Sequence, residues 1–320
     1  MSEASLLSVR GLSVDYPGPD GDHRALDRVY FSVDAHRCLA VVGESGSGKS
    51  SLVLALMGLL PRFSETDGAA LYKGQEISTL DEKAFRKIRG SEIGVVFQDP
   101  HAALNPLMQV GHQIAEALRG DGEMSAKASF SAAIDLLQRV GIASPDKRAK
   151  DYPHQLSGGI CQRVMIAIAL AGNPRLLLAD EPTSALDASV RGQILGLLGQ
   201  LKDEGLAIIL ATHDFSSVAQ ISDDLLVLYA GRMVERGPTE TILRNPRHPY
   251  TAALIGSLPQ FGGQPIPSVT VDPRKRFGGC RFSERCAYSQ EHCRVEEPHS
   301  QDVGERHRIR CWYPLQEAAR

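Results

Sequence analysis

The sequence lacks any long hydrophobic run. No stretch of its 320 residues approaches the roughly 18 apolar residues that a transmembrane helix needs. The first residues, Met1-Ser2-Glu3-Ala4, do not form the basic and then apolar pattern of a secretory signal peptide. We therefore expect a cytosolic chain that reaches a membrane only through partner proteins.

An excess of basic residues is also absent. The formal net charge is −3, and no basic stripe marks a nucleic-acid surface, so we expect no nucleic-acid partner. Hydrophobic residues make up 42% of the chain, which is usual for a globular protein with a sizeable core. The length suits one large α/β domain with an appendage, or two domains.

The most informative segment is Gly43-Glu44-Ser45-Gly46-Ser47-Gly48-Lys49-Ser50, which matches the pattern G-x-x-x-x-G-K-[ST] at every position. It follows an apolar run at 38–42 and precedes a helical pattern at 52–60, as a phosphate-binding loop requires. Glycine permits the unusual backbone angles that turn successive N–H groups toward a phosphate. We expect Lys49 to reach the β- and γ-phosphates of a nucleotide and the Ser50 hydroxyl to bind Mg²⁺.

Two further segments add to this hypothesis. The apolar run at 176–179 ends in Asp180 and Glu181, which predicts a strand whose end holds Mg²⁺ through Asp180 and polarises a water molecule through Glu181. The segment Leu156-Ser157-Gly158-Gly159 opens a helical pattern and predicts a second phosphate-binding surface. One chain does not need two such surfaces for one nucleotide, so we expect two chains to face each other.

In their order along the chain, these motifs resemble those of the ATP-binding cassette (ABC) ATPases, over roughly residues 5–255. The resemblance implies an α/β P-loop NTPase fold and catalytic roles for Lys49, Glu181 and His213. It implies Mg²⁺ bound through Ser50, Gln98 and Asp180. It also implies that Leu156, Ser157, Gly158 and Gly159 bind the partner's ATP and that a D-loop (Ser184, Ala185, Leu186 and Asp187) crosses the dimer interface. The ATP contacts it implies are Tyr16, Gly43, Glu44, Ser45, Gly46, Ser47, Gly48, Lys49, Ser50, Ser51, Gln98 and Asp180.

The expected domain organisation has an ABC ATPase domain at 1–258, with a helical subdomain at about 99–155. A segment rich in proline and glycine at 259–273 predicts a linker. Together with the cysteine-containing tail it forms the expected C-terminal module, 259–320.

Three longer segments, 97–106, 152–159 and 247–251, resemble the ATPase subunits of bacterial dipeptide/oligopeptide importers. That resemblance implies ATP-driven peptide import and a position at the cytoplasmic face of the cell membrane. The implied partners are a second, homologous ATPase, two transmembrane permease subunits and a substrate-binding protein. A nickel chelate or glutathione as cargo remains open, as does a soluble ABC ATPase acting on ribosomes or nucleic acid.

The tail holds Cys280, Cys286, Cys293 and Cys311, spaced C-x₅-C-x₆-C and then seventeen residues to the last. A zinc knuckle would favour C-x₂-C pairs, whereas four thiolates at wider spacing suit an iron–sulfur cluster. The importer resemblance adds a 4Fe–4S cluster in this tail, which we expect to be structural. Zinc and plain thiols stay open. Nearby arginines, Arg281, Arg285 and Arg294, could offset the negative charge of the thiolates.

Overall fold

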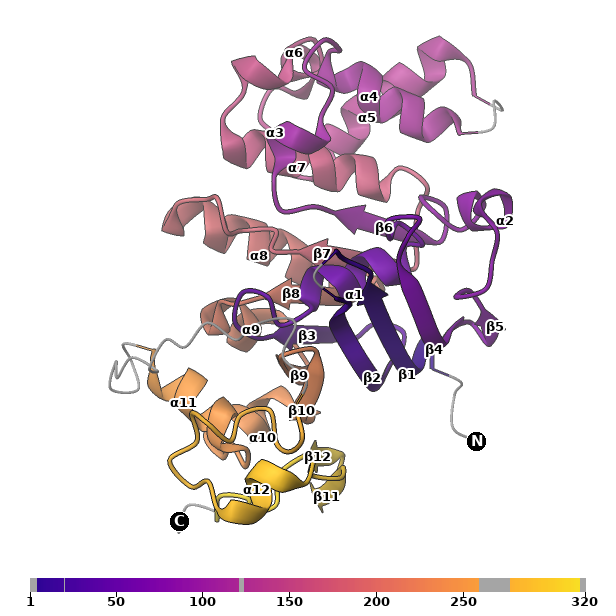
Figure 1. Ribbon diagram of the computed structural model, residues 1–320. Helices are drawn as coiled ribbons and strands as arrows, with labels where there is room; N and C mark the ends of the chain where they lie inside the picture. Colours follow the sequence, from indigo (N-terminus) through magenta and orange to yellow (C-terminus); the bar gives the residue numbers. More distant parts are fainter. Residues whose placement is uncertain (1–4, 20, 121–123, 259–276, 317–320) are drawn as a thin grey trace. The chain divides into compact units, whose positions relative to one another are not determined.

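The computed structural model describes residues 5–19, 21–120, 124–258 and 277–316. The chain forms two compact units (Figure 1). Unit 1 comprises Met1–Asp34, Cys38–Thr79 and Ala211–Arg320, and unit 2 comprises Ala35–Arg37 and Leu80–Leu210. The chain therefore leaves unit 1 after its first strands and returns to it for the C-terminal third.

Unit 1 opens with a four-stranded antiparallel sheet in the order β2-β1-β4-β5. The buried residues of β1 and β2, among them Leu7 and Val33, face the core, while neighbouring residues reach solvent. The strands of this four-stranded sheet are β1 (Leu7–Tyr16), β2 (His23–Val33), β4 (Glu65–Tyr72) and β5 (Gln75–Glu76).

A second sheet of unit 1 carries the order β11-β12-β10-β9-β3. Leu39 pairs with Asp224 and Val42 with Val227 in the parallel contact of β3 with β9. Both strands are buried along their whole length, as parallel strands covered on both faces are. The strands are β3 (Cys38–Val42), β9 (Asp224–Tyr229), β10 (Arg232–Pro238), β11 (Gln301–Gly304) and β12 (His307–Ile309).

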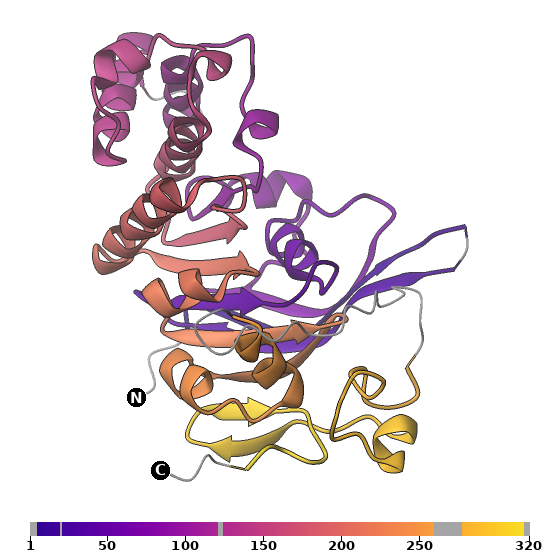
Figure 2. The same cartoon turned by 90° about the vertical axis from the view of Figure 1, so that its left-hand side faces the viewer.

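Residues 277–316, the C-terminal segment, extend this sheet. Glu235 of β10 pairs with Ile309 of β12, and Figure 2 shows the two C-terminal strands in yellow. The helices of unit 1 are α1 (Lys49–Leu56), α9 (Phe215–Ile221), α10 (Thr239–Arg244), α11 (Pro249–Gly256) and α12 (Glu291–Val295).

Unit 2 combines a parallel strand pair with a group of helices. Ile93 pairs with Leu176 and Val96 with Ala179 between β6 (Ile93–Val96) and β7 (Leu176–Asp180). Helices α4, α5 and α7 pack together (Figure 1). Strand β8 (Ala207–Thr212) spans the division between the units. The helices are α2 (Glu82–Arg86), α3 (Pro100–Ala103), α4 (Val110–Arg119), α5 (Ala126–Arg139), α6 (Pro145–Arg148), η1 (Pro153–Gln155), α7 (Gly158–Leu170) and α8 (Ala188–Asp203).

The strand predicted at 176–179 is confirmed as β7, and the helix predicted to follow Leu156-Ser157-Gly158-Gly159 is confirmed as α7. The predicted linker at 259–273 lies outside the described residues. The boundary predicted at 258 stays a prediction. The C-terminal segment itself belongs to unit 1, because β12 pairs with β10.

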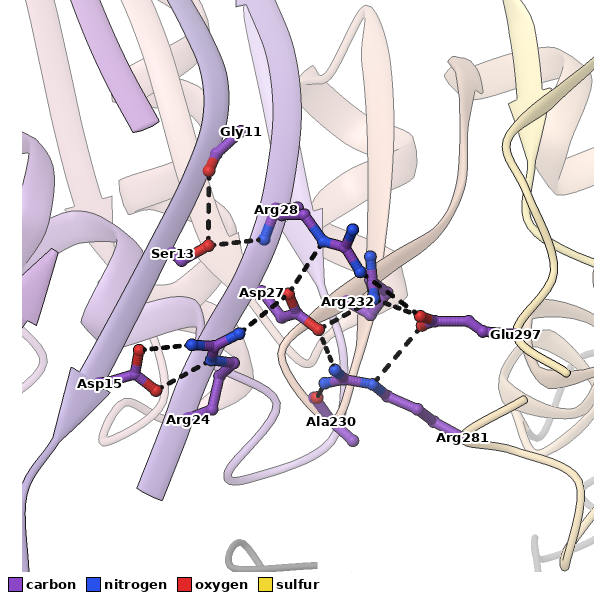
Figure 3. A network of polar contacts seen from close by, with 10 residues as sticks. All are labelled: Gly11, Ser13, Asp15, Arg24, Asp27, Arg28, Ala230, Arg232, Arg281 and Glu297. Atoms are coloured by element: carbon purple, nitrogen blue, oxygen red, sulfur yellow. Dashed lines mark hydrogen bonds and ion pairs between the residues drawn. The ribbon is translucent and has the colours of Figure 1, made fainter. Parts of the chain in front are cut away.

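A buried charge network joins the C-terminal segment to β2 and β10 (Figure 3). The Asp27 carboxylate lies 2.9 Å from the Arg232 guanidinium and also pairs with Arg281, and Glu297 pairs with Arg232 in turn. The side chains of Asp27 and Arg232 are only 6% and 5% exposed. Burial lowers the pKa of Arg232 to about 10, and the charges of Asp27 and Glu297 oppose that shift, so the guanidinium is charged at neutral pH.

Asp27→Asn should lower the free energy of unfolding by about 3 kcal/mol, because it leaves two arginines with one carboxylate fewer in a buried site. Urea denaturation followed by Trp312 emission measures this, since the only tryptophan of the chain lies in the C-terminal segment. Asp302→Asn is the matched control, because the Asp302–Arg308 pair is exposed and should contribute about 1 kcal/mol or less. Equal losses in the two variants would contradict the role given to Asp27.

His248 gives the fold a dependence on pH. Its Nδ1 accepts a hydrogen bond from the backbone N–H of Tyr250 at the start of α11, and the residue is 1% exposed. Burial lowers the pKa of His248 from 6.5 to about 4, so the folded protein keeps the imidazole neutral. The unfolded chain binds a proton below pH 6.5 that the folded chain excludes until about pH 4, so stability falls as the pH drops through that window.

We expect this histidine to cost about 2 kcal/mol of stability at pH 5 relative to pH 7. His248→Asn keeps a side chain that can cap the helix but removes the titration. Urea curves of both proteins at the two pH values give the difference. A variant with the same loss between pH 7 and pH 5 as the parent would contradict the assignment.

Candidate functional site

The phosphate loop, residues 43–50, connects β3 to α1. Gly48 has a φ of 104°, in the region that favours glycine, and a Cβ there would lie 2.5 Å from the carbonyl oxygen of Ala25. Glycine is therefore required at this point by both backbone conformation and space. The loop turns directly into the first turn of α1, where free backbone N–H groups and the helix dipole favour an anion.

Lys49 begins α1 and its side chain folds back over the loop. The Nζ atom donates to the carbonyl oxygens of Gly43 at 2.8 Å and Glu44 at 3.1 Å. Lys49 is 5% exposed, and a buried ammonium group needs such acceptors. The positive charge thus lies inside the loop, whereas Ser45, Gly46 and Ser50 are exposed along it.

Glu44 of the phosphate loop is held from the C-terminal third of the chain. Its carboxylate accepts two hydrogen bonds from the Arg285 guanidinium, at 2.7 and 2.8 Å. Its backbone N–H donates to the Tyr250 hydroxyl at 3.1 Å. Sequence reasoning missed both contacts, because it placed Arg285 with the cysteines and gave Tyr250 no role.

Tyr16 lies at the end of β1, where the sequence predicts a contact with adenine. Its hydroxyl donates to Ser51 Oγ at 3.1 Å, and its ring stacks on His23 at 6.2 Å between centroids. The tyrosine is therefore tied to α1 directly after the phosphate loop. His213, an exposed residue between β8 and α9, also belongs to unit 1.

Unit 2 holds the acidic candidates. Asp180 ends β7 and is buried, and Glu181 follows it with a φ of +46°. Such a backbone conformation is uncommon for a residue other than glycine. The turn is fixed by Ser184, whose hydroxyl donates to the Glu181 carbonyl at 3.1 Å.

Residues 156–159, here called the signature segment, and the D-loop, residues 184–187, both lie in unit 2. A Cβ on Gly159 would lie 2.5 Å from Val190 Cγ1, so α7 approaches α8 closely at this glycine. Asp187 caps α8 by accepting hydrogen bonds from the backbone N–H groups of Ser189 and Val190, at 3.0 Å each. Ser157 is the N-cap residue of α7 and is exposed, so the N-terminus of that helix faces solvent.

Gln98 is exposed in the bend between β6 and α3. Asp99 fixes the following helix by accepting from the backbone N–H of His101 at 2.9 Å and Ala102 at 3.2 Å. The structure thus puts Tyr16, the phosphate loop and His213 in unit 1, and Gln98, the signature, the acids and the D-loop in unit 2. The ligand contacts assigned to these residues stay predictions.

The four cysteines of the C-terminal segment line one cavity. Its wall also contains aromatic residues and His248, which places it beside α11. The lining residues are His248, Pro249, Cys280, Phe282, Ser283, Cys286, Tyr288, Ser289, Cys293, Cys311, Trp312 and Tyr313.

Burial raises the pKa of the Cys280, Cys286 and Cys311 thiols and so favours their protonated form. It raises the pKa of Cys280 to about 11 and that of Cys311 to about 12, and the charges of the neighbouring cysteines add to both shifts. A ligand that needs thiolates must therefore displace their protons and carry the charge itself. Within the described part of the chain, no three His, Cys, Asp or Glu side chains are arranged to hold a metal ion. None of the described helices is long and apolar enough to span a membrane.

Comparisons with known proteins identify the family of this chain. Residues 26–184 match the ABC transporter family, and residues 234–293 match the oligopeptide/dipeptide transporter C-terminal region. The dipeptide transport ATP-binding protein DppD of Escherichia coli (strain K12) is 42% identical over 323 residues, covering 99% of each chain. The Haemophilus influenzae DppD is 42% identical over 320 residues, covering 98% of this chain and 97% of the relative.

Among solved structures, a similar fold occurs in the ATP-binding cassette MJ0796, determined as a dimer in a post-hydrolysis state with ADP and Pi. The TM-score is 0.66 at 28% identity, over 73% of this chain and 98% of that one. The match at this coverage confirms the P-loop NTPase fold. The chain belongs to the ABC ATPases, in the group that carries the oligopeptide/dipeptide transporter C-terminal region.

Proposed function

We propose that this ABC ATPase powers the import of di- or oligopeptides through partner permease subunits. The observation that carries the proposal is the match of residues 234–293 to the oligopeptide/dipeptide transporter C-terminal region, on a chain 42% identical to DppD. A peptide is favoured over a nickel chelate or glutathione because the full-length relatives are dipeptide transport proteins. The expected place of work is the cytoplasmic face of the cell membrane.

In this proposal, ATP occupies the phosphate loop, and Lys49 stabilises the charge that develops on the transferred γ-phosphoryl group. Ser50, Gln98 and Asp180 would hold Mg²⁺, whose role is to offset charge on the phosphates. Glu181 accepts the proton of the attacking water, and His213 positions that water beside the γ-phosphate. The buried position of Lys49 within the loop supports its part.

Two cassettes face each other, each using its signature segment to bind the ATP of the other. The exposed N-terminus of α7 at Ser157 supports this role, because a helix N-terminus favours an anion. The partner is a homologous ATPase, and two permease subunits and a substrate-binding protein complete the importer. ATP favours the closed pair, and its hydrolysis lets the pair open.

Glu181→Gln should keep ATP binding and reduce hydrolysis at least about 100-fold, because glutamine cannot accept the proton of the attacking water. Phosphate release at saturating ATP measures hydrolysis, and size-exclusion chromatography with ATP tests for a trapped dimer. Glu204→Gln is the matched control, since Glu204 forms a surface pair with Arg139 and has no role in the site.

A Glu181→Gln variant that hydrolyses ATP at the parental rate would remove Glu181 from the mechanism. Peptide transport is tested separately, with a labelled dipeptide in cells that express the complete importer. If the parental ATPase supports no dipeptide uptake but supports nickel or glutathione uptake, the proposed cargo is wrong.

We also propose that the cysteine cavity holds a 4Fe–4S cluster with a structural role. The support is that all four thiols line one cavity. A four-iron cluster is larger than one ion and takes four cysteine ligands. Cys280, Cys286, Cys293 and Cys311 would hold it, and their deprotonation would be driven by the iron.

Anaerobically purified protein should contain about four irons and four sulfides per chain and absorb near 400 nm. Cys293→Ser should lose this iron. Cys161→Ser is the control, because Cys161 is buried in α7 of unit 2. One zinc per chain, or no metal, would contradict the cluster and leave the ATPase assignment intact.

A further inference from the structure

Arg285 of the C-terminal segment contacts the phosphate loop. Its guanidinium donates to both oxygens of the Glu44 carboxylate. The Arg285 side chain is 3% exposed, while that of Glu44 is 35% exposed and borders solvent. The two residues are 241 positions apart, so the pair closes a long-range contact of unit 1. A bidentate arginine–carboxylate pair fixes both position and orientation.

Aromatic rings hold Arg285 in place. Its guanidinium lies 5.7 Å from the Tyr229 ring centroid and 5.8 Å from that of Phe282. Tyr229 also meets Tyr250 edge-on at 4.6 Å, and Tyr250 meets Phe282 at 5.3 Å. Tyr250 is the residue whose hydroxyl accepts the backbone N–H of Glu44. Tyr229, Tyr250 and Phe282 form an aromatic cluster. The cluster contacts Glu44 directly through the Tyr250 hydroxyl and indirectly through Arg285.

A second connection reaches the middle of the phosphate loop. Arg281, four residues before Arg285, donates to the carbonyl oxygen of Ala230 and pairs with Asp27 (Figure 3). The next residue, Gly231, donates its backbone N–H to the Ser47 carbonyl at 3.0 Å. The C-terminal segment thus supports the loop at Glu44 directly and at Ser47 through the turn between β9 and β10.

The charge of Glu44 needs this support. The phosphate loop binds a polyanion, and a carboxylate within the loop repels the phosphates. Arg285 supplies the opposite charge from the side of the protein core. The hydrogen bonds to Glu44 raise the pKa of Arg285 above its usual value, so the guanidinium stays charged throughout the physiological range.

We propose that Arg285 is a positioning residue for ATP binding: it neutralises and orients Glu44, and so makes the affinity of the phosphate loop depend on the C-terminal segment. The inference rests on the proposed ATPase function and deepens it. In this role Arg285 acts through Glu44, to which its guanidinium donates both hydrogen bonds.

The test compares Arg285→Gln, Glu44→Gln and the double variant in the full chain, with the ATP Kd measured by titration of a fluorescent ATP analogue. Arg285→Gln should weaken ATP binding about fivefold or more, because Glu44 is left as an uncompensated negative charge. The kcat at saturating ATP should change much less than KM. The double variant should recover most of the affinity, because the repelling carboxylate is gone.

Recovery in the double variant separates this role from a structural one. If the pair were merely structural, removing Glu44 as well would give no gain in ATP affinity over Arg285→Gln. Arg285→Lys keeps the charge but loses the bidentate geometry, and should fall between the parent and Arg285→Gln. Arg294→Gln is the matched control, because Arg294 also neighbours a tail cysteine but is exposed. It should bind ATP like the parent.

Trp312 emission in urea shows whether each variant keeps its C-terminal segment folded. An unchanged ATP Kd in folded Arg285→Gln, or a double variant weaker than either single one, would overturn the proposal. Failure of the parental protein to bind or hydrolyse ATP would instead overturn the proposed function, so the two outcomes are distinct.

Discussion

The conformation of the phosphate loop is the constraint on which unit 1 depends. The loop must leave backbone N–H groups available to a ligand, so its internal hydrogen bonds, such as that from the Ser47 N–H to the Glu44 carbonyl at 3.1 Å, supply only part of its support. Gly48 supplies the required backbone angle, and the carbonyl of Ala25 lies too close for any larger residue. The rest of the support has to come from neighbours, which here are β2, the turn after β9, α11 and the C-terminal segment.

Those neighbours are bound to one another by buried charges. Asp27 of β2 pairs with Arg232 of β10 and with Arg281 of the C-terminal segment, in a site that excludes most solvent. Buried ion pairs contribute little net stability, but they penalise any arrangement that separates them. The network therefore specifies one placement of the C-terminal segment, and with it the placement of Arg285 at Glu44.

The features that could be predicted from the sequence are those set by residues close together along the chain. The phosphate loop, the strand ending in Asp180 and Glu181, and the helix after Ser157 are local patterns, and each was found at its predicted place. The pairing of Glu44 with Arg285 has no local pattern, because the residues are 241 positions apart and an arginine beside cysteines suggests a different partner. The positive φ of Glu181 was equally hidden, since it comes from the turn that Ser184 fixes.

The cysteine cavity and the aromatic cluster beside the phosphate loop have one residue in common, Phe282. Phe282 lines the cavity and packs against Tyr250, whose hydroxyl accepts the backbone N–H of Glu44. Under the role proposed for Arg285 the coupling is reciprocal: an ordered C-terminal segment would favour ATP binding, and bound ATP would favour the ordered segment. The cluster proposed at the cysteines would then act on the loop by holding its support in place, with no part in hydrolysis.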